Sequence, residues 1–258
     1  MTKLDEIVSH KRMELAEAKR NRPVAQLERA LKGRSAVRNF RQAIQRSGKI
    51  SLIAEVKRVS PSAGPIRAGA DAVEVGKLYS EAGAQALSVL TDSRFFSGSM
   101  ADLTAVRAAV PLPVLRKDFL LEEYQLLEAA AAGADAVLLI VAILKLVELK
   151  RLQRLANDLG FSALVEVHSE PELQQALEAG AGIIGINNRN LATFQVNLKI
   201  TERLIGGIPP DRAVVSESGI WSRSDVEFVQ RLGASAVLVG EELMAASDIP
   251  RRVKELMG

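Results

Sequence analysis

Five residues with acid–base or amide side chains lie at the ends of short aliphatic runs: Glu55, Lys57, Lys117, Glu166 and Asn187. A short aliphatic run bounded by a breaker, such as Pro61 after the first of them, predicts a buried strand. Because an unpaired charge is costly to bury, the charged groups must leave the core where the strands end. Ligands of parallel α/β proteins bind at the carboxyl ends of strands, so these residues predict a ligand site.

The charges in this set predict acid–base chemistry. Two carboxylates and two ammonium groups in one confined site shift one another's pKa values, which is how a protein obtains a general acid and a general base at neutral pH. The simpler interpretation is that Glu55 and Lys57 only form an ion pair on the rim. The full set, placed on alternate strands, favours catalysis.

Regular alternation of strands and helices places these residues. The strands are expected at 50–56, 86–90, 113–115, 136–143, 163–167, 183–186, 213–215 and 236–239, with helices between them and a last helix over 249–257. Four strands are preceded by a Gly-Ala-x-x tetrad that begins at Gly83, Gly133, Gly180 and Gly233, at steps of 50, 47 and 53 residues. Eight units in even–odd alternation predict an α/β protein with a single closed (β/α)8 TIM barrel over residues 1–258.

The first 49 residues form a basic helical extension in this prediction. Apolar spacing predicts a helix over 3–20, a second after Pro23, and a third around Phe40. The segment holds 13 Lys and Arg against 5 Asp and Glu, a net of +8, whereas the remainder holds 21 against 26. We expect it to cover part of the barrel mouth and to attract an anionic substrate, although a solvated helix face would have the same composition. Aromatic residues do not alternate with its charges, which argues against nucleic acid.

Composition excludes several classes. There is no cysteine, and therefore no disulfide or thiolate chemistry. The longest apolar run, 136–144, is too short to cross a bilayer, and the amino terminus has no apolar signal region. We expect a cytoplasmic monomer without metal or cofactor. Of the two histidines, His168 is expected to face away from Glu166.

A phosphate site is predicted after the last two strands. Ser218 and Gly219 follow one strand, and Gly240 and Glu241 follow the next, before a short helical turn. In this fold these loops often bind phosphate, and glycine lets backbone N–H groups approach it closely. Glu241 and Glu242 would repel a phosphate, so we expect both side chains to face outward.

The chain resembles the indole-3-glycerol phosphate synthase family over its whole length. The motifs that carry the resemblance are LDEIVSHKR, AEVKRVSPS, SVLTDSRFFSGS, LRKDFLLEEYQ, ADAVLLI, ALVEVH, GINNRNL, VVSESGI and VGEELM. The resemblance implies conversion of 1-(2-carboxyphenylamino)-1-deoxyribulose 5-phosphate to indole-3-glycerol phosphate, with loss of carbon dioxide and water. It implies a small anionic phosphosugar substrate and neither metal nor cofactor.

The resemblance also implies roles for the residues of its motifs. Lys117 is the general acid at the substrate ketone, Glu55 and Lys57 take part in proton transfer, and Glu166 is the other acid–base carboxylate. The remaining roles concern binding: Asn187 and Ser218 position the intermediate, Arg189 and Ser60 hold the anthranilate carboxylate, Phe96 and Phe119 flank the aromatic ring, and Gly219, Gly240 and Glu241 hold the phosphate through backbone N–H groups.

Three residues depart from the family pattern, and two other functions stay open. Asn190 and Asn197 stand where aspartate is usual, and Ala63 stands where lysine is frequent. Asn190 is expected to weaken an ion pair that orients Arg189. The alternatives are another phosphosugar isomerase or Schiff-base aldolase on the same barrel, and a non-catalytic barrel that binds an anionic ligand.

Overall fold

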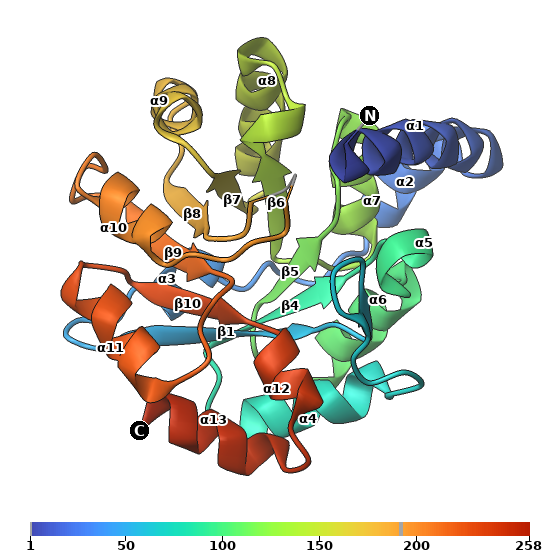
Figure 1. The fold of residues 1–258 in the computed structure, drawn as a ribbon. Coiled ribbons are helices and arrows are strands. Elements are labelled where there is room, and N and C mark those ends of the chain that lie inside the picture. Colours follow the sequence, from blue (N-terminus) through green and yellow to red (C-terminus); the bar gives the residue numbers. More distant parts are fainter. Residues whose placement is uncertain (1, 191–192) are drawn as a thin grey trace.

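Eight parallel strands close into one barrel, as the sequence predicted (Figure 1). The computed structural model describes residues 2–190 and 193–258; the last residue of the GINNRNL motif, at 191, lies outside this range. Each strand pairs with its neighbours in chain order, and the last pairs with the first. The barrel strands are β1 (Ser51–Val56), β4 (Ala86–Leu90), β5 (Val114–Lys117), β6 (Ala136–Ile140), β7 (Ser162–Val167), β8 (Ile183–Asn187), β9 (Ala213–Glu217) and β10 (Ala236–Val239).

Helices surround the barrel, one after nearly every strand (Figure 1). The outer helices are α4 (Ala72–Glu81), α6 (Met100–Ala109), α7 (Glu123–Ala131), α8 (Leu146–Asp158), α9 (Glu170–Glu178), α10 (Lys199–Ile205), α11 (Arg223–Arg231) and α13 (Ile249–Met257). The glycines of all four Gly-Ala tetrads have positive φ angles, between 82° and 105°. They end the preceding helix in the left-handed conformation, which only glycine adopts without strain.

Local structure in the loops differs from the expectation at several places. The strand predicted over 136–143 ends at Ile140, and a 3₁₀ turn, η1 (Val141–Ile143), follows it. An unbroken aliphatic run has no periodicity that separates strand from helix, so the sequence could not place this boundary. The hairpin β2 (Val59–Ser60) with β3 (Gly64–Pro65), and the helix α5 (Ser93–Phe96), were not predicted, whereas α12 (Glu241–Ala245) is the expected short helix.

The amino-terminal extension reaches both ends of the barrel. Its helices are α1 (Lys3–Asn21), α2 (Val24–Leu31) and α3 (Phe40–Ile44). Phe40 and Ile44 are fully buried and pack against the inward-facing aliphatic side chains of the strands, so α3 fills the amino-terminal end of the barrel. The first turns of α1 lie at the opposite end, where Lys3 and Ile7 line a pocket.

We predict that Phe40→Ala lowers the free energy of unfolding by about 3–5 kcal/mol, because it leaves a cavity between α3 and the barrel interior. Urea denaturation followed by circular dichroism measures this loss. Met13→Ala, at a position in α1 that is 61% exposed, is the matched control and should change stability by less than about 0.5 kcal/mol. Equal losses in the two variants would show that α3 contributes nothing to the core.

Candidate active site

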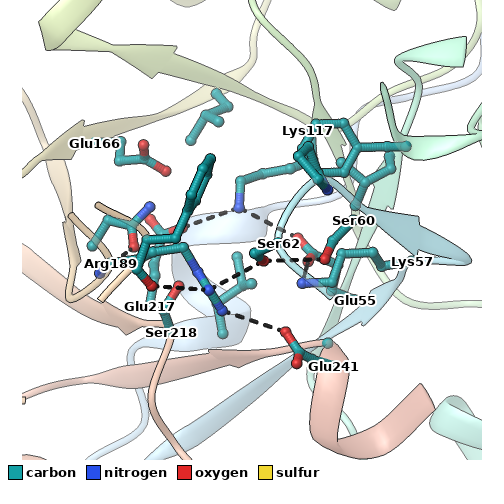
Figure 2. A pocket seen from close by; sticks show the side chains of 18 of the residues that line it. Glu55, Lys57, Ser60, Ser62, Lys117, Glu166, Arg189, Glu217, Ser218 and Glu241 are labelled. Carbon is teal, nitrogen blue, oxygen red and sulfur yellow. Dashed lines mark hydrogen bonds and ion pairs between the residues drawn. The ribbon is translucent and has the colours of Figure 1, made fainter. Parts of the chain in front are cut away.

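A single pocket at the carboxyl ends of the strands contains all the predicted site residues, and Figure 2 shows part of its lining. The acid–base and positioning candidates lining it are Glu55, Lys57, Lys117, Glu166, Asn187 and Ser218, and the binding candidates are Ser60, Phe96, Phe119, Arg189, Gly219, Gly240 and Glu241. They come from strand ends and loops spread over more than 180 residues of sequence. The closed barrel brings them together because the carboxyl ends of all its strands lie at one end.

The ammonium group of Lys117 lies between two buried carboxylates (Figure 2). Its Nζ is 3.3 Å from Oε2 of Glu55 and 3.2 Å from Oε2 of Glu217. Burial alone lowers the pKa of Lys117, but attraction to these carboxylates outweighs burial and raises that pKa. Lys117 is therefore positively charged in the unliganded site. A Schiff-base aldolase needs a neutral lysine, so this charge state argues against that alternative.

Glu55 is held as a carboxylate. It is 4% exposed, and burial raises its pKa, but Lys117 and then Lys57 lower it to a net value below the usual range. Its Oε2 accepts a hydrogen bond of 3.2 Å from Ser88 Oγ, and its Oε1 is 3.4 Å from Lys57 Nζ. The ion pair of Glu55 and Lys57 that the simpler interpretation placed on the rim exists, but it lies inside the pocket and is part of a larger cluster.

Glu217 is the site residue that the sequence interpretation missed. It ends β9, is 1% exposed, and contacts Lys117. Burial raises the pKa of Glu217, and the positive charge of Lys117 lowers it. The negative charge of Glu166 raises it further, and the resulting pKa is about 7. The signal was present, because Glu217 stands at the carboxyl end of an aliphatic run, as Glu55 does. Gly185 on β8 makes room for it, since a Cβ at Gly185 would overlap Oε1 of Glu217.

The side chain of His168 faces Glu166, whereas the sequence analysis predicted that it faces away. Its Nε2 lies 3.4 Å from Oε1 of Glu166, and its Nδ1 lies 3.1 Å from Oε2 of Glu172. The expectation was wrong because residues two apart along a strand share a face. His168 directly follows the last residue of β7, and its imidazole lies on the side of Glu166.

The side chain of Glu241 faces the pocket, which corrects a second expectation. Its Oε2 is 3.3 Å from Nη2 of Arg189, and the same guanidinium donates a 3.2 Å hydrogen bond from Nη1 to Ser62 Oγ (Figure 2). The sequence analysis assumed an outward orientation because Glu241 lies in the first turn of α12. Its attraction to the guanidinium of Arg189 turns the carboxylate toward the pocket instead. Glu242, in contrast, turns to Arg252, which donates a 2.7 Å hydrogen bond from Nε.

The loops after β9 and β10 approach the pocket with their backbone. Ser218 and Gly219 both have left-handed φ angles, of 64° and 79°. At Gly240, a Cβ would meet Oε1 of Glu55 at 2.7 Å, so the glycine leaves room for the position that this carboxylate adopts. Opposite them, the rings of Phe96 and Phe119 lie 6.1 Å apart at 37° and form an apolar side of the pocket.

Two of the three departures from the family pattern support local turns. Oδ1 of Asn190 accepts a hydrogen bond of 3.0 Å from the Thr193 N–H, and Oδ1 of Asn197 accepts one of 3.0 Å from the Lys199 N–H. An asparagine oxygen fills this acceptor position as an aspartate oxygen does. Nothing in the structure explains alanine at position 63.

The fold and the pocket define a class of protein, namely the (β/α)8-barrel enzymes with acid–base groups at the strand ends. Solved structures with this fold include 3-hexulose-6-phosphate synthase from Salmonella typhimurium, with a TM-score of 0.65, 16% identity, and coverage of 81% of this chain and 97% of that one. Thiamine phosphate pyrophosphorylase from Pyrococcus furiosus has a TM-score of 0.61, 18% identity, and coverage of 84% and 96%. At these identities the likeness concerns the fold alone.

The sequence specifies the family within this class. The family model for indole-3-glycerol phosphate synthase matches residues 4–256. Curated relatives of that name include the protein of Acetivibrio thermocellus, 46% identical with 98% of both chains covered, and that of Caldanaerobacter subterraneus subsp. tengcongensis, 47% identical with 98% and 97% covered. The chain belongs to the indole-3-glycerol phosphate synthase family, the carboxy-lyases of tryptophan biosynthesis. Within residues 2–190 and 193–258, no helix has the length and apolar character to span a membrane.

We predict that Glu217→Gln gains stability relative to the parent protein as pH rises. The folded pKa of Glu217, about 7, lies above its ordinary value of 4.5, so between these values the folded parent binds more protons than the unfolded chain. The titration of Glu217 therefore lowers the free energy of unfolding of the parent protein as pH rises from 4.5 to 7. Glutamine does not titrate, so the Glu217→Gln variant does not lose this stability. Urea denaturation at several pH values measures the difference.

The exposed Glu178→Gln, changed in the same way on α9, is the control for this titration. A stability difference between the Glu217 variant and the parent that stays constant from pH 4.5 to 7 would contradict the raised pKa.

Proposed function

We propose that the pocket closes the indole ring of 1-(2-carboxyphenylamino)-1-deoxyribulose 5-phosphate, releases carbon dioxide and water, and forms indole-3-glycerol phosphate. The observation that supports this assignment is a charged Lys117 held between Glu55 and Glu217, in a pocket that also contains a guanidinium and two aromatic rings. Family membership supports the same substrate.

In the first step the ring carbon that bears the carboxylate attacks the ketone carbon. Lys117 donates a proton to the ketone oxygen, which becomes a hydroxyl group, and the new carbon–carbon bond closes the five-membered ring. Loss of the carboxylate as carbon dioxide then restores the electrons of the aromatic ring. A cationic acid suits this step because negative charge develops on the oxygen. Glu217, 3.2 Å from Lys117 Nζ, is placed to return a proton to the lysine.

Dehydration completes the reaction. The hydroxyl group leaves as water with a proton from an acid of the cluster, and a base removes a proton from the carbon next to the nitrogen, so that the indole double bond forms. We assign the base to Glu166, which lies in the pocket without a lysine or arginine partner among the described residues. Glu55 and Lys57 complete the proton transfers, and Asn187 and Ser218 position the intermediate.

Binding is proposed to use the groups around this cluster. The guanidinium of Arg189 releases Glu241 and binds the anthranilate carboxylate, because a substrate carboxylate pairs with a guanidinium as the Glu241 carboxylate does. Ser60 and Ser62 lie beside this carboxylate. Phe96 and Phe119 flank the aromatic ring. The backbone N–H groups at Gly219, Gly240 and Glu241 hold the phosphate. The basic extension, through α1 at the mouth, attracts the anionic substrate.

We place the protein in the cytoplasm as a monomer whose partner is this small anionic phosphosugar, with no nucleic acid or membrane surface. Family membership argues against another phosphosugar isomerase, and the non-enzymatic alternative is a barrel that only binds an anionic ligand. Such a barrel would not need a buried cluster in which a charged lysine contacts two carboxylates, because binding an anion requires no proton transfer. The acid–base cluster therefore favours catalysis.

Lys117→Ala is expected to lower kcat by roughly a hundredfold or more, the usual scale for loss of a general acid. The measurement is the rise of indole fluorescence from the carboxyphenylamino ribulose phosphate. Lys150→Ala, on the outer face of α8, removes a lysine outside the pocket and should retain the parent kcat. Near-normal turnover of Lys117→Ala, with only KM changed, would exclude this role.

The phosphate proposal predicts a small effect on KM at one loop and a large effect at the neighbouring loop. Glu241→Ser keeps the backbone donor and frees Arg189, so KM should stay within a few-fold of the parent value. Gly219→Val should raise KM substantially, because its backbone has a left-handed φ and an added Cβ would meet Val196. Steady-state kinetics on the same substrate measure both. An unchanged KM in Gly219→Val would place the phosphate elsewhere.

A further inference from the structure

The imidazole of His168 lies between two carboxylates, one inside the pocket and one behind it. On the far side, Oε2 of Glu172 in α9 accepts a 2.8 Å hydrogen bond from the His168 backbone N–H and lies 3.1 Å from Nδ1 of the ring. On the near side, Nε2 is 3.4 Å from Oε1 of Glu166. This Nε2 is buried and has no hydrogen-bond partner among the described residues. Glu172 thus fixes the ring so that its free nitrogen faces Glu166.

Glu166 has a different counter-charge from the other two carboxylates of the cluster. Lys117 contacts both Glu55 and Glu217. Around the carboxylate of Glu166, in the part of the chain that the structure describes, the one basic group within 4.0 Å is the imidazole of His168. Glu166 is 3% exposed. A buried carboxylate without a counter-charge takes up a proton, and a protonated Glu166 is no base.

We propose that His168, as an imidazolium, is a positioning residue that keeps Glu166 ionised and oriented as the base of the reaction. The catalytic consequence rests on the proposed function, whereas the ion pair is a property of the unliganded protein. Among the described residues, the charged groups with the largest effect on the ring are the carboxylates of Glu166 on β7, Glu172 on α9 and Glu217 on β9. Burial lowers the pKa of His168, but its bond to Glu172 and its attraction to Glu166 outweigh burial and raise that pKa.

The kinetic test is the pH dependence of kcat/KM in His168→Gln. Loss of the imidazolium should move the acid limb of the profile to higher pH by about one unit, since a single charge at contact distance changes a pKa by that order. At pH values below the acid limb, this shift lowers kcat/KM of the variant by about tenfold. At pH values above the acid limb, kcat and KM of the variant approach the parent values. Glu172→Gln should move the limb in the same direction by less, because it releases only Nδ1.

His10→Gln is the matched control, because His10 is the only other histidine and its Nε2 contacts Glu14 on the same helix. It should leave the limb in place. An acid limb that does not move in His168→Gln, or a kcat reduced by the same factor at every pH, would overturn the proposal.

A second measurement does not depend on activity. Nuclear magnetic resonance can titrate the imidazole of His168 in the free protein, where its pKa should lie above 6.5, and should fall in Glu166→Gln because the coupling of two charges is reciprocal. The same pKa in both proteins would overturn the ion pair. If the parent protein failed to convert the substrate but showed this coupling, the proposed function would be refuted and the ion pair supported.

Discussion

A positive charge buried among negative charges is the interaction on which the rest of this site depends. Burial alone lowers the pKa of Lys117 and raises the pKa values of Glu55 and Glu217. In contact, the pKa of Lys117 is raised and that of Glu55 is lowered, so both are charged, while the pKa of Glu217 stays raised at about 7. Removing one member of such a cluster leaves an uncompensated buried charge. The acid and its neighbours therefore form one unit, whose charge states cannot be assigned one residue at a time.

Two glycines of the barrel leave room for the carboxylates of this cluster. Gly185 leaves the space that the carboxylate of Glu217 occupies, and Gly240 leaves the space that Glu55 needs. Below the cluster, the barrel interior is aliphatic and is filled at its base by Phe40 of α3. The interior thus changes from apolar packing at one end to paired charges at the other, which separates stability from chemistry along the barrel axis.

The amino-terminal extension is tied to the same cluster by a second buried charge. Lys11 of α1 is 5% exposed, and its Nζ is 2.7 Å from Oδ2 of Asp92 and 3.0 Å from Oδ1 of Asp118. Asp118 directly follows Lys117, and Arg116 also contacts it; these cations outweigh burial and lower the pKa of Asp118. The helix at the mouth and the strand that carries Lys117 are therefore held by one network.

The sequence by itself determined the order of strands and helices, the closed barrel, and the presence of all predicted site residues in one pocket. These properties follow from patterns along single segments: aliphatic runs, Gly-Ala helix ends, and polar groups where strands stop. Even the side on which His168 lies follows from the two-residue period of a strand, although it was assigned wrongly. Only the tertiary structure decided that Glu217 joins Lys117, that Glu241 turns to Arg189, and which carboxylates are ionised. The physical reason is that a side chain's direction and charge depend on groups from other strands, and no pattern within one segment contains them.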